Sequence, residues 1–183
     1  DDGDELVGVN MCSKGDSIVL GTKNGMSIRF GEEGARAMGR TAVGVRGIKL
    51  DDDDAVCDMV VTDGSGTLMT ICENGYGKRT SVDEYRSQTR GGKGIIDIRA
   101  TERNGKVVNL LSVTDDDEVM MITKDGQIVR TEVGGISVIG SNTQGVRCIS
   151  LRKGDKLVSV ARIPQEEPEV AGDAPSGDEE AKG

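Results

Sequence analysis

The chain has 183 residues, a net charge of −9, 27 glycines and three prolines, and it contains neither histidine nor tryptophan. The lack of histidine excludes catalysis by a histidine general base and metal sites built on imidazole. Because one phenylalanine and two tyrosines are the only aromatic residues, the core must consist of Val, Ile, Leu and Met, and the glycine content is typical of many short strands joined by tight turns.

Three repeats of about 50 residues, the period of a propeller blade, run through residues 4–54, 55–106 and 107–156. Each repeat reads as strand, tight turn, strand, glycine turn, strand, loop and strand. In the first repeat, Asn24-Gly25 separates two apolar runs, which is a strong hairpin signal because both residues tolerate positive φ. The pattern predicts an all-β fold of three four-stranded antiparallel blades.

The predicted strands are, in chain order, 6–12, 17–22, 26–30, 44–50, 55–62, 67–72, 76–80, 94–100, 107–114, 119–123, 127–131 and 145–151. A further strand, 157–163, matches the start of a fourth repeat. We expect this surplus strand to pair either within the third blade or with the blade around residues 6–12 of a second copy.

The negative charge is concentrated at the C-terminal end. Residues 164–183 hold seven acids and one base among Pro, Gly and Ala, and we expect a disordered acidic tail because this composition cannot bury a core. Residues 1–163 are closer to neutral, so their basic side chains can form a local positive surface.

The four cysteines, Cys12, Cys57, Cys72 and Cys148, show no C-x-x-C spacing and lie in apolar runs. We expect reduced, buried thiols of a cytosolic protein. No signal peptide or apolar run of membrane length is present, so no membrane partner is expected. The chain begins with Asp-Asp-Gly-Asp, and we expect it to be a piece of a longer protein.

A basic glycine loop, Gln88–Gly94, combines two cations with three glycines. Glycine lets the backbone approach a ligand closely, and a run of backbone N–H groups beside Arg and Lys suits phosphate oxygens. The alternative is a plain glycine turn with two solvated charges. The residues that would form the site are Gln88, Arg90, Gly91, Gly92, Lys93 and Gly94.

Arg29, Arg79 and Arg130 occupy equivalent places near the end of each repeat's third strand, shortly after the hairpin turn. They either protect strand edges from aggregation or contact DNA. Gly44, Gly94 and Gly145 are also equivalent, and each opens the fourth strand of its repeat.

Three motifs resemble one known family: Asn74–Thr80, Thr101–Gly105 and Gly140–Val146. The sequence is similar to the C-terminal domains of the A subunit of bacterial DNA gyrase. That resemblance implies a β-pinwheel, a propeller-like ring whose blades exchange strands, and DNA wrapped around its rim. The gyrase box of the family, Gln-Arg-Arg-Gly-Gly-Lys-Gly, is matched by Gln88–Gly94 except at Thr89, which indicates a degenerate box in a late blade.

The resemblance implies sequence-independent binding and bending of duplex DNA within a type II topoisomerase that introduces negative supercoils. Its partners would be double-stranded DNA, the rest of the gyrase A subunit and the gyrase B subunit, in the bacterial cytoplasm. ATP and Mg would act elsewhere in that complex, and this piece would hold no catalytic residue. The expected DNA contacts are Lys78, Arg79, Arg86, Arg90 and Lys93, followed by Arg29, Arg40, Arg46 and Arg130.

Two alternatives remain open: the equivalent domain of the topoisomerase IV A subunit, and a propeller that binds protein. We also expect self-association, because three blades leave both ends of the row exposed.

Overall fold

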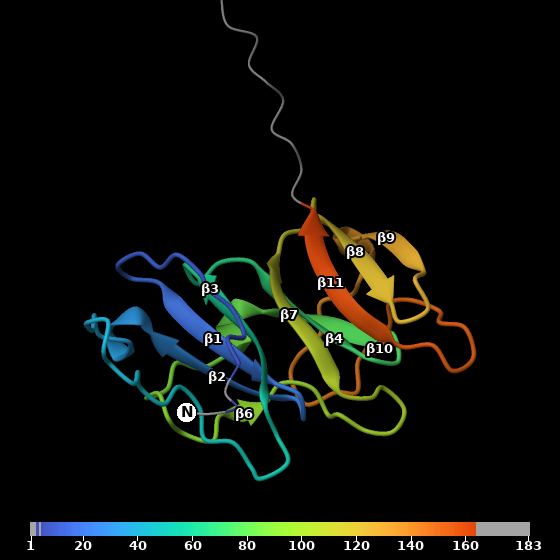
Figure 1. Ribbon diagram of the computed structural model, residues 1–183. Helices are drawn as coiled ribbons and strands as arrows, with labels where there is room; N and C mark the ends of the chain where they lie inside the picture. Colours follow the sequence, from blue (N-terminus) through green and yellow to red (C-terminus); the bar gives the residue numbers. More distant parts are fainter. Residues whose placement is uncertain (1–2, 4, 164–183) are drawn as a thin grey trace, which may run out of the picture.

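The computed structural model describes residue 3 and residues 5–163, so the predicted acidic tail lies outside the described residues (Figure 1). The predicted all-β fold is confirmed: eleven strands among these residues form three sheets, joined by loops and three short 3-10 turns. We call these sheets the first, second and third blades. No helix among the described residues is long and apolar enough to span a membrane.

The first blade is built around the hairpin β1 (Ser17–Thr22) and β2 (Met26–Gly31). Gly25, at φ 87°, supplies the left-handed residue that the hairpin turn needs. Two flanking strands come from the next repeat: β3 (Val56–Thr62) pairs with β1, and β6 (Ile95–Ile96) pairs with β2.

The other two blades repeat this plan. In the second blade the order is β10-β5-β4-β7, with β4 (Thr67–Cys72), β5 (Tyr76–Ser81), β7 (Val107–Val113) and β10 (Val146–Arg147). The third blade has the order β11-β8-β9, with β8 (Glu118–Thr123), β9 (Ile128–Glu132) and β11 (Leu157–Ile163). Each hairpin therefore borrows its flanking strands from the sequence that follows its own repeat, and the strand exchange implied by the family resemblance is confirmed.

This exchange corrects several predicted strands. Residues 6–12 and 44–50 form no strand. Their equivalents in later repeats pair with the hairpin of the repeat before, and no hairpin precedes them among the described residues. The strands predicted at 94–100 and 145–151 shrink to two residues each. The strand at 157–163 is not surplus, because it pairs with β8 and completes the third blade, which has three described strands rather than four.

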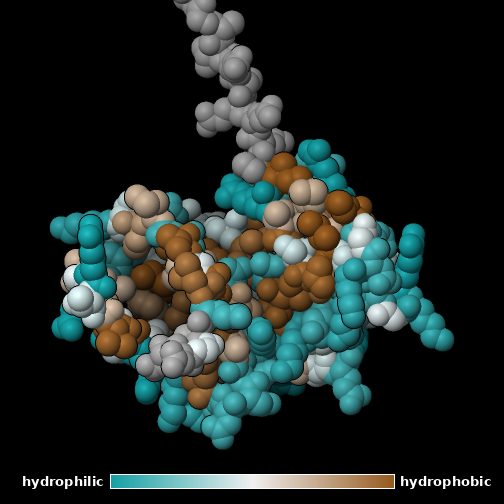
Figure 2. Space-filling model, in the orientation of Figure 1, coloured by the Kyte–Doolittle hydropathy of each residue, from teal (hydrophilic) through white to brown (hydrophobic). Residues whose placement is uncertain are grey.

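Hydrophobic side chains fill the spaces between blades. One cluster joins the first blade to the second through Val19, Val60, Leu68, Val82 and Leu110, and a larger cluster joins the second to the third. Figure 2 shows further hydrophobic side chains gathered over the middle of the face on which β7 and β11 lie. The core therefore lies between the sheets: the second blade packs against the first, and the third packs against the second.

Each blade also carries a 3-10 turn after its hairpin: η1 (Glu32–Gly34), η2 (Val82–Glu84) and η3 (Val133–Gly135). Val82 and Val133, the first residues of η2 and η3, are fully buried. They belong to the clusters that fill the two joints between blades.

Candidate nucleic-acid interface

The basic glycine loop lies against the first repeat. Gly91 donates its N–H to the carbonyl of Gly47, and Lys49 donates its N–H to the carbonyl of Gly92 at 2.8 Å. Gly94 has φ 78°, and a Cβ at this position would collide with the carbonyl oxygen of Ser27. A residue with a side chain does not fit there. The close approach is to the protein's own Ser27, whereas the sequence predicts that the glycines of this loop admit a ligand.

Arg90 holds this loop in place. Its Nε donates to the carbonyl of Gly34 at 2.6 Å, and its Nη1 donates to the carbonyl of Arg46 at 3.1 Å. Beside it lies a cavity of about 490 Å³ that Gln88, Arg36 and Phe30 also line. Arg90 therefore fixes the loop with two of its nitrogens. Its half-buried side chain is less available for contact with a DNA phosphate than a solvated cation would be.

Four other predicted contacts are exposed: Arg40, Arg46, Arg86 and Lys93. Lys93 belongs to the basic glycine loop and Arg86 precedes it. The loop bonds to the backbone of Arg46 and Gly47, which places Arg46 beside it. These cations remain candidates for phosphate contact.

Lys78 is buried, and the prediction that it contacts DNA is wrong. Its side chain has no exposed surface, and its Nζ lies 2.9 Å from Asp97 Oδ1 and 2.7 Å from Thr80 Oγ1. The hydroxyls of Tyr85 and Thr70 donate to the same carboxylate, each at 2.6 Å. Burial, with Asp97 beside it, raises the pKa of Tyr85. This network ties β5 and β4 to the segment that follows the basic glycine loop.

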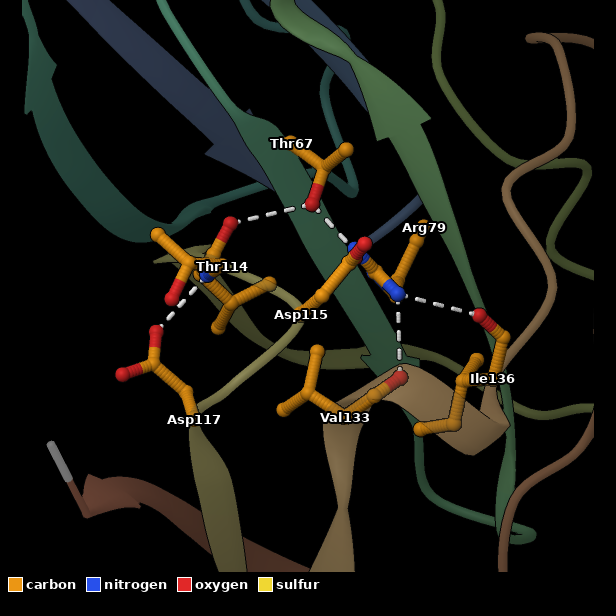
Figure 3. Close-up of polar contacts among 8 residues, drawn as sticks. Thr67, Arg79, Thr114, Asp115, Asp117, Val133 and Ile136 are labelled. Atoms are coloured by element: carbon orange, nitrogen blue, oxygen red, sulfur yellow. Dashed lines mark hydrogen bonds and ion pairs between the residues drawn. The ribbon is translucent and has the colours of Figure 1, made fainter. Parts of the chain in front are cut away.

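Arg79 is also buried, and it joins two blades instead of contacting DNA (Figure 3). Its Nη1 donates to the carbonyls of Val133 at 3.0 Å and Ile136 at 3.3 Å, around η3. Its Nη2 pairs with Asp115, and its Nε donates to Thr67 at 3.2 Å. Neither edge protection nor DNA contact, the two roles considered from the sequence, describes this arginine.

Arg29 makes the same joint between the first and second blades. Its Nη1 donates to the carbonyls of Val82 at 3.0 Å and Tyr85 at 3.3 Å, around η2. The half-buried side chain is thus committed to structure. Arg130, the third equivalent, is exposed and pairs with Glu118 of its own blade.

A second basic cluster, centred on Tyr76, was missed by sequence reasoning. The guanidinium carbons of Arg103 and Arg147 lie 4.6 and 5.4 Å from the centre of its ring, and Arg147 also donates to its hydroxyl at 2.9 Å. This hydrogen bond, with Arg103 nearby, lowers the pKa of Tyr76. One signal was available: Arg147 follows Gly145-Val146 as Arg46 follows Gly44-Val45.

The loop beside this cluster is the third repeat's counterpart of the basic glycine loop. Arg103 donates to Gln144 at 3.4 Å, and Arg99 donates to Asn142 at 2.6 Å. No carboxylate bonds to Arg103 or Arg147 among the described residues, so their charges are available to an external anion. No group of His, Cys, Asp or Glu in the described part of the chain is arranged to hold a metal ion.

Comparison with known families gives a match to the DNA gyrase C-terminal domain, a β-propeller, over residues 16–63, 66–114 and 117–164. Each matched stretch spans one hairpin and the long strand that completes its blade.

Curated relatives agree. The DNA gyrase A subunit of Salmonella typhimurium is 46% identical over 184 residues, which cover 98% of this chain and 21% of that protein. The DNA gyrase A subunit of Mycolicibacterium smegmatis is 41% identical over 168 residues, 91% of this chain and 20% of that protein. The chain thus spans about a fifth of the length of these relatives.

Two solved structures share the fold. One is the DNA gyrase A C-terminal domain, with a TM-score of 0.76 and 28% identity, covering 82% of this chain and 52% of that one. The other is the C-terminal domain of DNA topoisomerase IV, with a TM-score of 0.75 and 21% identity, covering 81% of this chain and 46% of that one.

Proposed function

Since the chain belongs to the family of DNA gyrase C-terminal domains, as its motifs indicated, we propose that it binds and bends duplex DNA without reading its sequence. The observation that carries the proposal is an exposed set of cations around two loops held by backbone hydrogen bonds on neighbouring blades. The proposed contacts are Arg40, Arg46, Arg86 and Lys93 at the basic glycine loop, Arg103 and Arg147 at the Tyr76 cluster, and Arg99 at the loop beside that cluster.

Phosphate contact explains this arrangement better than base reading does. Specific readout needs a helix or ribbon that enters a groove, and the described residues contain only short 3-10 turns and compact sheets. Neutralising phosphates releases counterions and supplies affinity that does not depend on sequence. Bending the duplex costs several kcal/mol, and contacts at two successive blades offset that cost.

In the complete protein we propose that this domain directs ATP-dependent negative supercoiling, together with the rest of the gyrase A subunit and the gyrase B subunit. The cleavage chemistry, ATP and Mg²⁺ belong to those other parts. This proposal places the domain in the bacterial cytoplasm, at the nucleoid.

Gyrase is a better assignment than topoisomerase IV. Relatives named as the A subunit of gyrase reach 46% identity over nearly the whole chain. Among the solved structures, the gyrase domain is 28% identical, and the topoisomerase IV domain, at 21% identity, shares the fold alone. A protein-binding propeller is the second candidate, and only the hydrophobic face of Figure 2 favours it.

The test is fluorescence anisotropy of an unrelated-sequence duplex at rising salt. The double variant Arg86→Ala/Lys93→Ala should lower the log–log salt slope by about two, since each phosphate contact contributes roughly 0.9. It should weaken duplexes of different sequence equally. The control is Lys14→Ala/Lys153→Ala, which removes two exposed lysines from turns outside the proposed contacts. An unchanged slope in the first variant, or equal losses in both, contradicts the assignment.

A further inference from the structure

The two arginines of the Tyr76 cluster are oriented by neutral groups. Arg103 donates to Oε1 of Gln144 at 3.4 Å, and Arg147 donates to the hydroxyl of Tyr76 at 2.9 Å. Neither guanidinium forms an ion pair with a carboxylate among residues 5–163. Each therefore keeps its full charge while its side chain is oriented. Other arginines are paired with carboxylates: Arg79 with Asp115, Arg130 with Glu118 and Arg162 with Asp117.

The ring of Tyr76 draws both charges towards one point. The guanidinium carbons of Arg103 and Arg147 lie 4.6 and 5.4 Å from its centre. At such distances the negative face of an aromatic ring attracts a guanidinium. Two cations beside the same ring also repel each other. Tyr76 therefore offsets a repulsion that would otherwise move the two side chains apart.

The sheet fixes the position of Tyr76. It is the first residue of β5 and lies directly opposite Arg147 of β10 in the antiparallel register. Side chains at opposite positions stand on the same face of a sheet, within reach of each other. The preceding residue, Gly75, is packed so closely that a Cβ there would lie 2.6 Å from the carbonyl oxygen of Ile149. The ring is therefore carried by a tightly held backbone.

A buried asparagine fixes the turn that carries Arg103. Asn104 has no exposed surface, and its Nδ2 donates to the carbonyls of Arg99 at 2.9 Å and Gln144 at 3.2 Å. Its Oδ1 accepts the N–H of Thr101 at 2.7 Å. These bonds tie the turn bearing Arg103 to the loop bearing Gln144. The backbone around the cluster is thus ordered without any ligand.

The hairpin itself does not require an aromatic residue at this position. The equivalents of Tyr76 are Met26 in the first hairpin and Gln127 in the third. Both form the same turn, and the N–H of each donates to a threonine hydroxyl four residues earlier, at 3.1 Å. The arginines beside Tyr76 therefore explain the tyrosine better than the fold of its blade does.

We propose that Tyr76 is a positioning residue for DNA binding, whose ring and hydroxyl hold Arg103 and Arg147 together as a clamp for backbone phosphates of the duplex. The choice of ligand rests on the proposed function. A guanidinium has five N–H donors, and the bonds described here leave most of them for phosphate oxygens. Because both side chains are ordered beforehand, less conformational entropy is lost when the phosphates bind.

The positioning can be measured in the full 183-residue chain without DNA. Nuclear magnetic relaxation of the arginine Nε–H groups reports side-chain order on the picosecond-to-nanosecond timescale. Order at Arg103 and Arg147 should fall in Tyr76→Met. Tyr76→Phe keeps the ring but loses the hydroxyl, so order should fall mainly at Arg147. Equal order at both arginines in all three proteins would overturn the proposal.

The effect on DNA is measured by anisotropy titration of a duplex at several salt concentrations. Tyr76→Met should raise Kd at least about fivefold, because two side chains must then be ordered on binding. The log–log salt slope should hardly change, since no charge is lost. Arg103→Ala/Arg147→Ala should lower that slope by about two. Adding Tyr76→Met to this double variant should have no further effect, because Tyr76 acts through the two arginines.

A matched control is Gln127→Met, which makes the corresponding change in the third hairpin and should bind DNA like the wild type. Circular dichroism should show one fold throughout, since methionine occupies the equivalent position in the first hairpin. If Tyr76→Met unfolds, Tyr76→Phe carries the same test through the order and affinity lost with the hydroxyl.

Two results would separate this inference from the proposed function. Wild-type affinity in Tyr76→Met, or a further loss when Tyr76→Met is added to the arginine double variant, would overturn the positioning role while DNA binding stands. A wild-type chain that binds no duplex would overturn the proposed function, and the clamp with it.

Discussion

Lys78 Nζ and Asp97 Oδ1 lie 2.9 Å apart inside the molecule, and both side chains are almost completely shielded from solvent. Asp97 stands alone in an apolar run, Ile95-Ile96-Asp97-Ile98, whose strand pairs with the first blade. The ion pair therefore fixes the segment after the basic glycine loop to the second blade, while the loop itself lies on the first repeat.

Removing one partner of this ion pair should lower the stability of the folded chain. Asp97→Asn leaves a buried ammonium without its counter-charge, and we expect a loss of about 3–5 kcal/mol in the free energy of unfolding. Urea denaturation measures it. Lys78→Met/Asp97→Asn should lose less than the sum of the two single variants, because no isolated charge remains. Asp83→Asn, at an exposed position, is the control, and equal effects of Asp83→Asn and Asp97→Asn would contradict the role of the pair.

Arg79 and Arg130 occupy equivalent positions and should differ sharply when truncated. Arg79→Ala leaves the carbonyls of Val133 and Ile136 without their donor inside a joint, and we expect a loss of about 3 kcal/mol in stability. Arg130→Ala removes an exposed ion pair, and should change stability by less than about 1 kcal/mol. The comparison uses thermal and urea unfolding at low protein concentration. Similar losses in the two variants would show that Arg79 does not stabilise the joint.

Gly94→Ala should destabilise the chain by at least about 2 kcal/mol, because the methyl meets the carbonyl of Ser27 and the residue has positive φ. Gly140 lies in the third repeat's counterpart of the same loop, with nothing near its Cβ position and no positive φ. Gly140→Ala should therefore stay within about 0.5 kcal/mol of the wild type. If both variants unfold at the same urea concentration, close backbone approach at Gly94 is not important for stability.

The thiols should make stability fall in alkali. Burial raises the pKa of Cys57 and Cys72 to about 12 and that of Cys148 to about 11, from 9.0. A raised pKa in the folded state gives stability that is complete below the unfolded pKa and is lost as pH rises from about 9 towards about 12. Urea denaturation should show this fall above about pH 9, and a flat profile from about pH 6 to 8, where a chain without histidine has no titrating side chain at its ordinary pKa.

Thiol labelling checks the same feature independently. Cys12 is exposed, so the sequence prediction that it is buried is wrong. Cys72 is buried, and Cys57 and Cys148 are half-buried. A disulfide reagent at about pH 8, just below the ordinary thiol pKa, should modify one thiol quickly in the folded chain and all four in urea. Fast modification of more than one thiol without urea would contradict the burial of the others, and the Cys12→Ser variant should show no fast phase.

The hairpins could be predicted from the sequence because their signals are local. Asn24-Gly25, Asn74-Gly75 and Asp125-Gly126 each sit between apolar runs, and each forms the expected turn. The pairing of flanking strands could not be predicted in the same way. Nothing within residues 6–12 says which hairpin they would join, since that depends on a repeat elsewhere in the chain.

The site was harder to predict, since successive residues of a strand normally point to opposite faces. Lys78 and Arg79 were expected at the surface, but β5 lies between other elements on both sides and buries both. The isolated Asp97 in its apolar run was the available sign that a buried cation exists. The Tyr76 cluster joins residues 71 positions apart, Tyr76 and Arg147, which no local pattern reveals.

The borrowing of strands by each hairpin has a consequence for how the molecule comes apart. In most repeat proteins each unit has some stability of its own, and neighbours add to it. Here a hairpin deprived of the next repeat keeps two strands, and a two-stranded hairpin is marginally stable at best in water. One sequence repeat therefore does not contain all the strands of a blade, and it cannot fold stably without the repeat that follows it. Unfolding should therefore be a single cooperative transition, without a stage at which one blade is unfolded and its neighbours are intact.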